Sequence, residues 1–150
     1  MTFFLDVNLL LYAAFDSYSE HAVCSAWLEG MLSDSPHLIG FPTVALLGFV
    51  RISTQSRSSY SPITMEEALE QVERWIEPPN AYVPHPAEGH INRVAALLRS
   101  VNGDHSLVTD AHLAALALEH QATMCSHDGD FRRFSALTVF DPLQPLPPII

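Results

Sequence analysis

Short apolar runs alternate along the chain with longer stretches in which apolar residues recur every three or four positions. The short runs are typical of buried strands, and the longer spacing is typical of one face of a helix. Strands are predicted at residues 2–5, 37–40, 81–83, 122–125 and 137–140. Because short buried strands separated by helices form parallel sheets, the pattern predicts an α/β fold of three layers, with a short, mostly parallel central sheet flanked by helices.

Helices are expected in the intervals between these strands. They are predicted at residues 8–14, 41–52 and 107–120, from Ser17 or Ser19 onward, and from Pro86 onward. Thr64 and Glu67 have the spacing of a capping box, so another helix should follow Thr64. Residues expected to face the core are Ala22, Val23, Ala26, Trp27 and Met31 in the second helix, and Ile91, Val94, Ala95 and Leu98 in the fifth.

Two segments have no such pattern. Residues 53–62 are polar and rich in serine, which predicts an exposed and mobile loop. Residues 142–150 contain four prolines and are expected to form an extended tail. Because the chain shows no internal repeat, residues 1–150 are interpreted as a single domain.

The composition, with 48% hydrophobic and 16% charged residues, is that of a folded protein. The net charge is −10 because 17 acids face 7 bases, all of them arginines. This excess disfavours broad phosphate binding unless cations reverse the local field, and it suits a basic protein partner. Cys24 and Cys125 have no motif spacing and are expected to be buried. Without a signal peptide or a membrane span, a cytoplasmic location and no membrane partner are expected.

Four aspartates occupy positions from which they could meet. Asp6 directly follows the first strand, Asp128 and Asp130 follow the fourth, and Asp110 falls in the first turn of a very apolar helix. In open parallel sheets, ligands bind beyond the carboxyl ends of the strands. We therefore expect these carboxylates to gather at one edge of the sheet.

A cluster of carboxylates needs either protons or a cation. Two like charges about 4 Å apart repel by roughly 4 kcal/mol at an effective dielectric constant of about 20. Oxygen ligands without histidine or thiolate favour Mg²⁺ or Mn²⁺ over zinc. Such an ion can activate a water molecule and neutralise a phosphate during hydrolysis.

Each aspartate also has a purely structural explanation. Asp6 suits a helix N-cap, Asp110 is favoured by the dipole at a helix start, and Asp128-Gly129-Asp130 suits a turn. For a single residue, the sequence does not separate the two explanations. Taken together the structural explanations are weaker, because Asp6 and Asp110 border apolar segments in which an unpaired carboxylate is costly.

Three segments carry a family resemblance: Phe4-Leu5-Asp6-Val7-Asn8-Leu9-Leu10, residues 108–117, and Ser126-His127-Asp128-Gly129-Asp130-Phe131. In this order and spacing they resemble the PIN domain and, within it, the VapC-type ribonuclease toxins of bacterial toxin–antitoxin pairs. His21 with Trp27, Phe49-Val50-Arg51, Phe134 and Asp141-Pro142-Leu143 also fit, so the similarity covers nearly the whole chain.

The resemblance implies a PIN fold and endonucleolytic cleavage of RNA with Mg²⁺ or Mn²⁺. It implies that Asp6, Asp110 and Asp130 ligate the metal, with Asp128 as a fourth catalytic acid in the same pocket. Asn8 and Ser126 would orient ligands or water through hydrogen bonds. The resemblance also implies a homodimer and a small antitoxin protein that covers the site.

One position departs from the family pattern. Many PIN domains have a glutamate in the helix after the second strand, where this chain has Gly48 and no acid between residues 41 and 52. The departure leaves open the number of metal ions and makes Asp128 the expected substitute. A PIN domain without activity, acting as a protein- or RNA-binding module, therefore remains the alternative.

Other polar residues near these segments are secondary candidates. Arg51, Arg132 and Arg133 are candidates for contacts with RNA phosphates, although ion-pair or surface roles also explain them. Structural roles are expected for His112 and His127. Core positions are expected for Phe131 and Phe134.

Two other functions also place an aspartate after the first strand. A haloacid-dehalogenase-type phosphatase requires Asp-x-Asp and a later lysine, whereas this chain has Asp6-Val7-Asn8 and no lysine. A phosphoacceptor signalling module also requires a lysine. The sequence therefore excludes both.

Overall fold

The computed structural model describes residues 1–33, 35–55 and 62–144. Its centre is a five-stranded sheet in the order β3-β2-β1-β4-β5. The strands are β1 (Thr2–Leu5), β2 (Leu38–Gly40), β3 (Ala81–Tyr82), β4 (Thr123–Cys125) and β5 (Val139–Phe140). Each neighbouring pair is parallel, so the predicted α/β fold with a parallel central sheet is confirmed.

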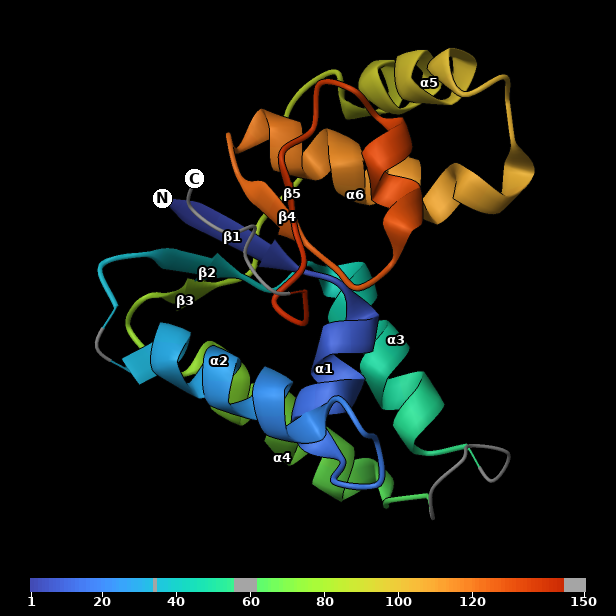
Figure 1. The fold of residues 1–150 in the computed structure, drawn as a ribbon. Coiled ribbons are helices and arrows are strands. Elements are labelled where there is room, and N and C mark those ends of the chain that lie inside the picture. Colours follow the sequence, from blue (N-terminus) through green and yellow to red (C-terminus); the bar gives the residue numbers. More distant parts are fainter. Residues whose placement is uncertain (34, 56–61, 145–150) are drawn as a thin grey trace.

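Helices cover both faces of this sheet (Figure 1). One face carries α1 (Val7–Ala14), α2 (His21–Ser33), α3 (Thr43–Ser53) and α4 (Met65–Ile76). The other face carries α5 (His90–Ser100) and α6 (Val108–Glu119), together with the short 3-10 helices η1 (His105–Leu107) and η2 (Gly129–Arg133). The arrangement has the three layers that the sequence predicts.

Alternate residues of the central strands supply two separate cores. Leu5 packs in the cluster beside α1 to α4, whereas Phe4 packs in the cluster beside α6. The register pairs Leu5 with Cys125 and Phe4 with Met124, and each pair shares a cluster. Successive strand residues point to opposite faces, so a buried strand needs apolar residues at every position.

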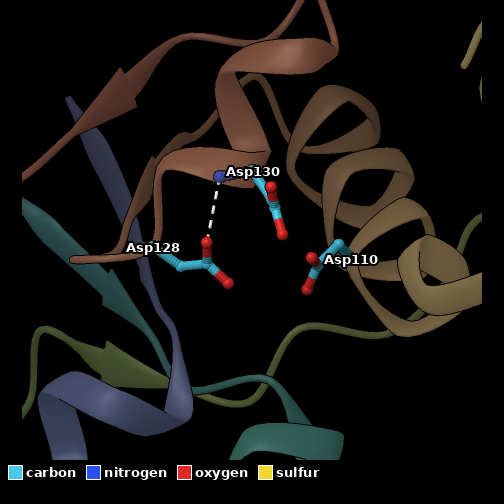
Figure 2. Close-up of side chains that lie close together, drawn as sticks. All are labelled: Asp110, Asp128 and Asp130. Carbon is cyan, nitrogen blue, oxygen red and sulfur yellow. Dashed lines mark hydrogen bonds between the residues drawn. The ribbon is translucent and has the colours of Figure 1, made fainter.

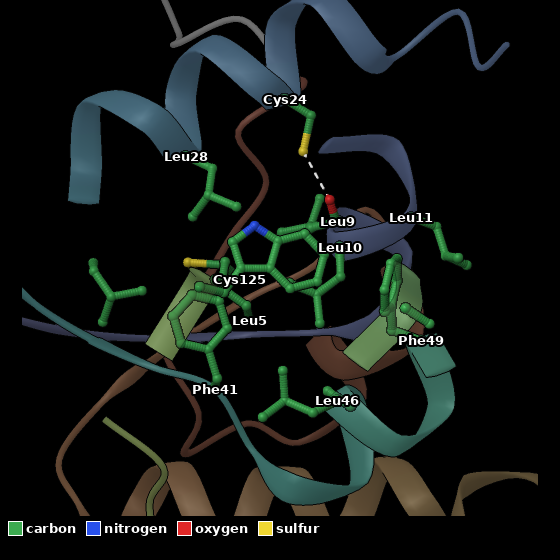
Figure 3. Close-up of a cluster of buried hydrophobic side chains, with 14 residues drawn as sticks. Leu5, Leu9, Leu10, Leu11, Cys24, Leu28, Phe41, Leu46, Phe49 and Cys125 are labelled. Atoms are coloured by element: carbon green, nitrogen blue, oxygen red, sulfur yellow. Dashed lines mark hydrogen bonds between the residues drawn. The ribbon is translucent and has the colours of Figure 1, made fainter. Parts of the chain in front are cut away.

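The buried cysteines belong to the first of these cores (Figure 3). Cys24 and Cys125 are both fully buried and unpaired, as predicted. The thiol of Cys24 donates a hydrogen bond to the carbonyl oxygen of Leu9 at 3.2 Å. This bond fastens α2 to α1, the helix that begins directly after Asp6.

Close packing between β1 and β2 depends on a glycine. Gly40 lies opposite Phe4 in the register of the two strands. A Cβ atom at position 40 would lie 2.3 Å from Cδ1 of the Phe4 ring, which is fully buried. A side chain at this position would therefore displace the central strand's largest core residue.

The predicted start of α5 is wrong. The helix begins at His90 rather than at Pro86, after Gly89 in the left-handed conformation with φ of 79°. The backbone N–H of Ala87 instead donates to the Glu119 carboxylate at 2.9 Å, which holds the segment before α5 against α6. Ile91, expected to face the core, is 76% exposed in the first turn of the helix, whereas Val94 and Leu98 of the same expected face pack against the core beside α6.

The buried face of α2 also differs from the prediction. Its buried residues are Cys24 and Leu28, whereas Val23 is 54% exposed. Trp27 and Met31 pack only at the border of the core. The predicted buried face lies about one residue away from the observed one. Alanine and valine on an exposed helix face cannot be distinguished by sequence from core residues.

Several boundaries agree with the sequence. The capping box before α4 is present, with Thr64 and Glu67 exchanging hydrogen bonds of 3.1 Å. Ser53, expected in the exposed serine-rich loop, is instead the last residue of α3 and is fully buried. Residues 56–61 of that loop lie outside the described residues, as do residues 145–150 of the predicted tail. Residues 142–144, the described part of that tail, form a turn and not the extended segment that was predicted, because the carbonyl oxygen of Asp141 accepts from the N–H of Gln144 at 3.2 Å. None of the described helices is both long and apolar enough to cross a membrane.

Candidate metal centre

The candidate site lies where the order of the strands reverses. From β1 the sheet continues to β2 and β3 on one side and to β4 and β5 on the other. Asp6 follows β1 and Ser126 follows β4, and the pairing of Leu5 with Cys125 brings the two residues side by side. Ligands of open parallel sheets bind at the carboxyl ends of strands at such a switch point.

Three carboxylates converge at this point (Figure 2). Asp110 comes from the first turn of α6, and Asp128 and Asp130 come from the segment after β4. One oxygen of each lies within 4.8 Å of the other two. Asp110 is partly buried and the other two are exposed, so the cluster opens to solvent. Oxygen donors at this spacing suit Mg²⁺ or Mn²⁺.

Asp128 caps η2 and faces the cluster at the same time. Its Oδ1 accepts from the backbone N–H of Asp130 at 2.9 Å. Its own N–H donates to the Ser126 hydroxyl at 2.9 Å. Because the cap uses one carboxylate oxygen, the second remains for a cation. The turn explanation and the ligand explanation of this residue are therefore compatible.

Asp6 is buried beside the cluster and is only 8% exposed. Its Oδ1 accepts from the N–H of Val7 at 2.8 Å, at the start of α1. Its Oδ2 accepts from the Ser126 hydroxyl at 2.7 Å. Asp6 is thus the one member of the predicted ligand set that lies outside the closest group of carboxylates, in which Asp128 stands instead.

Burial and mutual repulsion disfavour the charged forms of these acids. Burial raises the pKa of Asp6, and the charge of Asp128 raises it further, against the hydrogen bonds from Ser126 and Val7. Burial also raises the pKa of Asp110 to about 6, helped by the charges of Asp6, Asp128 and Asp130. A bound cation would relieve this repulsion.

Ser126 and Asn8 connect the acids. The hydroxyl of Ser126, 1% exposed, donates to Asp6 and accepts from the Asp128 N–H and from Asn8 Nδ2, the last at 3.4 Å. The Asn8 Oδ1 atom is buried and has no hydrogen-bond partner within the described part of the chain. A buried acceptor without a donor, beside converging carboxylates, fits a site that takes a cation and its water.

The family model of the PIN domain matches residues 3–137. The chain belongs to the PIN domain family. Among the curated relatives of this PIN domain, ribonuclease VapC37 of Mycobacterium tuberculosis is 40% identical over 133 residues, or 89% of this chain and 92% of the relative. Ribonuclease VapC33 of the same species is 34% identical over 139 residues, or 93% of this chain and 96% of the relative. The resemblance found in the sequence is confirmed.

Solved structures show the same PIN fold. VapBC2 from Rickettsia felis, bound to a DNA fragment from its promoter, matches with a TM-score of 0.68 and 15% identity over 94% of this chain and 98% of that chain. VapBC-1 from nontypeable Haemophilus influenzae matches with a TM-score of 0.68 and 16% identity, over 96% and 100% of the two chains. At such identities the likeness concerns the fold alone.

Gly48 lies beside the candidate centre of this PIN domain. A Cβ atom there would lie 3.3 Å from Cγ2 of Val7, the residue after Asp6. A side chain at position 48 would therefore point toward the start of α1. No acid in α3 adds to the cluster, since Thr43–Ser53 contains none.

The three arginines named from the sequence have different surroundings. Arg133 donates to Asp104 at 3.2 Å, which ties the end of η2 to the segment before η1. Arg132 and Arg51 are exposed, and neither has an ion pair with another described residue. Contacts of these arginines with RNA stay predictions.

The histidines and phenylalanines have internal partners. His127 Nδ1 lies 2.8 Å from the Asp141 carboxylate, and His112 Nδ1 lies 2.7 Å from His90 Nε2. Phe131 and Phe134 are buried in the core, as predicted. His90 was not among the residues predicted from the sequence, because its partners lie 22 and 29 positions away and share no local motif with it.

Proposed function

We propose that this PIN domain is an endoribonuclease that hydrolyses RNA phosphodiester bonds with Mg²⁺ or Mn²⁺, and that it acts as the toxin of a toxin–antitoxin pair. The observation that carries the proposal is the convergence of Asp110, Asp128 and Asp130 within 4.8 Å at the switch point of the sheet. The relatives named ribonucleases VapC37 and VapC33 support the reaction type.

The contacts of each residue indicate its role in the proposed reaction. Asp110, Asp128 and Asp130 would hold the metal ion, and Asp6 would complete the site from its buried position. When bound, the ion neutralises the scissile phosphate and lowers the pKa of an attacking water. Ser126 fixes Asp6 and the backbone of Asp128, and Asn8 Oδ1 accepts a hydrogen bond from a water at the site.

The partners proposed are RNA, an antitoxin and a second copy of the chain. Arg51, Arg132 and Arg133 are the candidate phosphate contacts. A cognate antitoxin is supported by the net charge of −10, which suits a basic partner.

An assay of purified protein on RNA tests the proposed activity. We expect cleavage with Mg²⁺ or Mn²⁺, none with EDTA, and a loss of at least 100-fold in Asp130→Asn, on the order of the effect of removing one essential catalytic group. Asp16→Asn, at an exposed position between α1 and α2, is the matched control and should cleave like wild type. Cleavage that persists in EDTA would contradict the mechanism.

A binding module without activity is the second candidate, and Gly48 is the observation that favours it. The position points toward the start of α1 but contributes no carboxylate. The same assay separates the two candidates. RNA binding without cleavage at any Mn²⁺ concentration would establish the binding module.

A further inference from the structure

A pocket lies beside α6, the helix that carries Asp110 in its first turn. Its volume is about 280 Å³, and Val44, Leu47, Pro84 and Pro86 form apolar walls around the polar groups of Thr43 and His112. Its walls come from the segments that leave β2 and β3 and from α6. The pocket therefore shares with the candidate metal centre the carboxyl edge of the sheet.

A buried chain of hydrogen bonds ends at the histidine of this pocket. The Glu119 side chain, 1% exposed, accepts from the Ala87 N–H through Oε1 at 2.9 Å and contacts His90 Nδ1 through Oε2 at 2.6 Å. His90 Nε2 in turn lies 2.7 Å from His112 Nδ1. Hydrogen bonds therefore connect Glu119 of α6 to His90 of α5, and His90 to His112 of α6.

The carboxylate of Glu119 sets the direction of every hydrogen bond in this chain. A carboxylate only accepts hydrogen bonds, so His90 donates from Nδ1 to Glu119. Neutral His90 then accepts at Nε2 from the Nδ1–H of His112. Since a neutral imidazole carries one proton, the Nε2 atom of His112 is left as an acceptor. Glu119 and His90 are positioning residues that fix this tautomer.

We propose that the pocket binds an unpaired base of the RNA substrate, with His112 Nε2 accepting a hydrogen bond from an amino or imino group of the base. The proposal rests on the proposed ribonuclease function. Proline and aliphatic walls suit the face of a base, and one fixed acceptor selects its edge. No arginine among the described residues lines the pocket, so a base fits it better than a phosphate.

The position of His112 on α6 indicates which nucleotide would be read. It follows Asp110 by two residues, about 3 Å along the helix axis, but projects from another side of the helix. The bound base would therefore belong to a different nucleotide from the one whose phosphate lies at the metal centre. The pocket would set a sequence preference at one position near the cut.

Glu119→Gln tests this proposal because it reverses the hydrogen-bond chain without altering the pocket wall. The amide oxygen of the glutamine still accepts the hydrogen bond from the Ala87 N–H, and its amide N–H donates to His90 Nδ1. His90 then donates from Nε2, so His112 becomes a donor at Nε2. On short RNAs varied near the cut, at pH 8 with Mn²⁺, we expect the preferred base to change from one offering a donor to one offering an acceptor.

The expected change is roughly tenfold in the ratio of KM values, as for one hydrogen bond. The ¹⁵N chemical shifts of His112 report the tautomer independently of RNA. Arg93→Gln is the matched control, because it removes the 3.4 Å contact with Glu119 but leaves the direction of the chain unchanged. His112→Phe removes the acceptor and should abolish the preference.

Different failures point to different errors. If the folded Glu119→Gln and His112→Phe variants cleave RNA with the wild-type base preference, the proposal that the pocket binds a base is wrong. The proposed ribonuclease function is not affected by that result. If wild type cleaves no RNA with either metal, the proposed function itself is wrong. An unchanged preference together with loss of a dimer in His112→Phe would assign the pocket to a second copy of the chain and overturn the proposal.

Discussion

Ser126 is the residue on which the arrangement of the acids most depends. It is almost completely buried, and its single hydroxyl contacts Asp6, Asn8 and the backbone of Asp128. A hydroxyl suits this place because it donates to one carboxylate while it accepts from two N–H groups. A carboxylate at position 126 would instead add a further charge to the cluster.

Ser126→Ala should therefore weaken both the fold and the site. Loss of the hydroxyl leaves Asp6 Oδ2 buried without its donor, which costs about 1–3 kcal/mol. We expect a lower free energy of unfolding in urea and weaker Mn²⁺ binding by calorimetry. Ser135→Ala, at an exposed position, should change neither. Wild-type Mn²⁺ affinity in Ser126→Ala would show that this hydroxyl does not organise the acids.

Asp110 should make the stability of the metal-free protein depend on pH. Its pKa of about 6 in the folded protein exceeds the ordinary value of 3.8, so the folded state holds a proton that the unfolded state has lost. Between these values, stability contributed by protonated Asp110 falls as pH rises, and above pH 6 it is absent.

Asp110→Asn should consequently stabilise the EDTA-treated protein. The gain in Tm is expected to be largest above pH 6 and to shrink as the pH falls toward 4, while the variant loses the stabilisation that Mn²⁺ gives to wild type. Thermal unfolding at several pH values measures both effects. A destabilised variant at pH 7.5 in EDTA would contradict the repulsion inferred at the site.

Elements whose signal is local could be predicted from the sequence. β1 was found at its observed bounds because Thr2–Leu5 is a closed apolar run that ends at Asp6. The capping box of Thr64 and Glu67 fixed the start of α4. These signals act over a few residues, where propensity and side-chain chemistry decide the backbone.

Elements and contacts set by distant partners could not be predicted. The start of α5 depends on Glu119, which holds the Ala87 N–H from 32 positions away. The bond between Ser126 and Asp6 follows from the register of β1 and β4, which the sequence does not state. The four aspartates, with Asp128 in the same pocket, were named from strand ends and family likeness, whereas the distances between their oxygens required the three-dimensional arrangement.

Gly40 provides a test at the scale of the sheet. In Gly40→Ala the new Cβ would meet the Phe4 ring at 2.3 Å, so the β1–β2 pair should lose stability. We expect a loss of about 1–3 kcal/mol in urea unfolding, as for other overpacked cores. In α2, Gly30 has nothing within 4 Å of its Cβ position, and Gly30→Ala should raise stability by up to about 1 kcal/mol. Equal effects of the two substitutions would contradict the packing described.

At the scale of the whole molecule, an acidic protein is proposed to act on an acidic polymer. With a net charge of −10 and no lysine, its attraction for RNA depends on few cations and on the metal centre. The topology concentrates the acids of three segments at one switch point, while Arg132 lies in the same short helix as Asp130. Under the proposed function, the molecule would combine a local site for phosphate with an acidic surface that otherwise repels RNA.

Arg132 should contribute measurably to the salt dependence of RNA binding. In an Asp130→Asn background, Arg132→Gln is expected to reduce the slope of log affinity against log salt concentration by about 0.7, the value for one single-strand phosphate. Fluorescence anisotropy at several salt concentrations gives this slope. Arg74→Gln, on α4, is the control and should leave it unchanged. An unaltered slope in Arg132→Gln would remove this arginine from the RNA surface.

The proposed function depends most on a metal centre formed by acids from α6 and from the segment after β4. Anomalous diffraction from crystals grown with Mn²⁺ locates the ion directly. We expect a peak among the carboxylates of Asp110, Asp128 and Asp130, absent in Asp130→Asn crystals. A well-ordered site without a peak at saturating Mn²⁺, or a peak elsewhere on the chain, would contradict it.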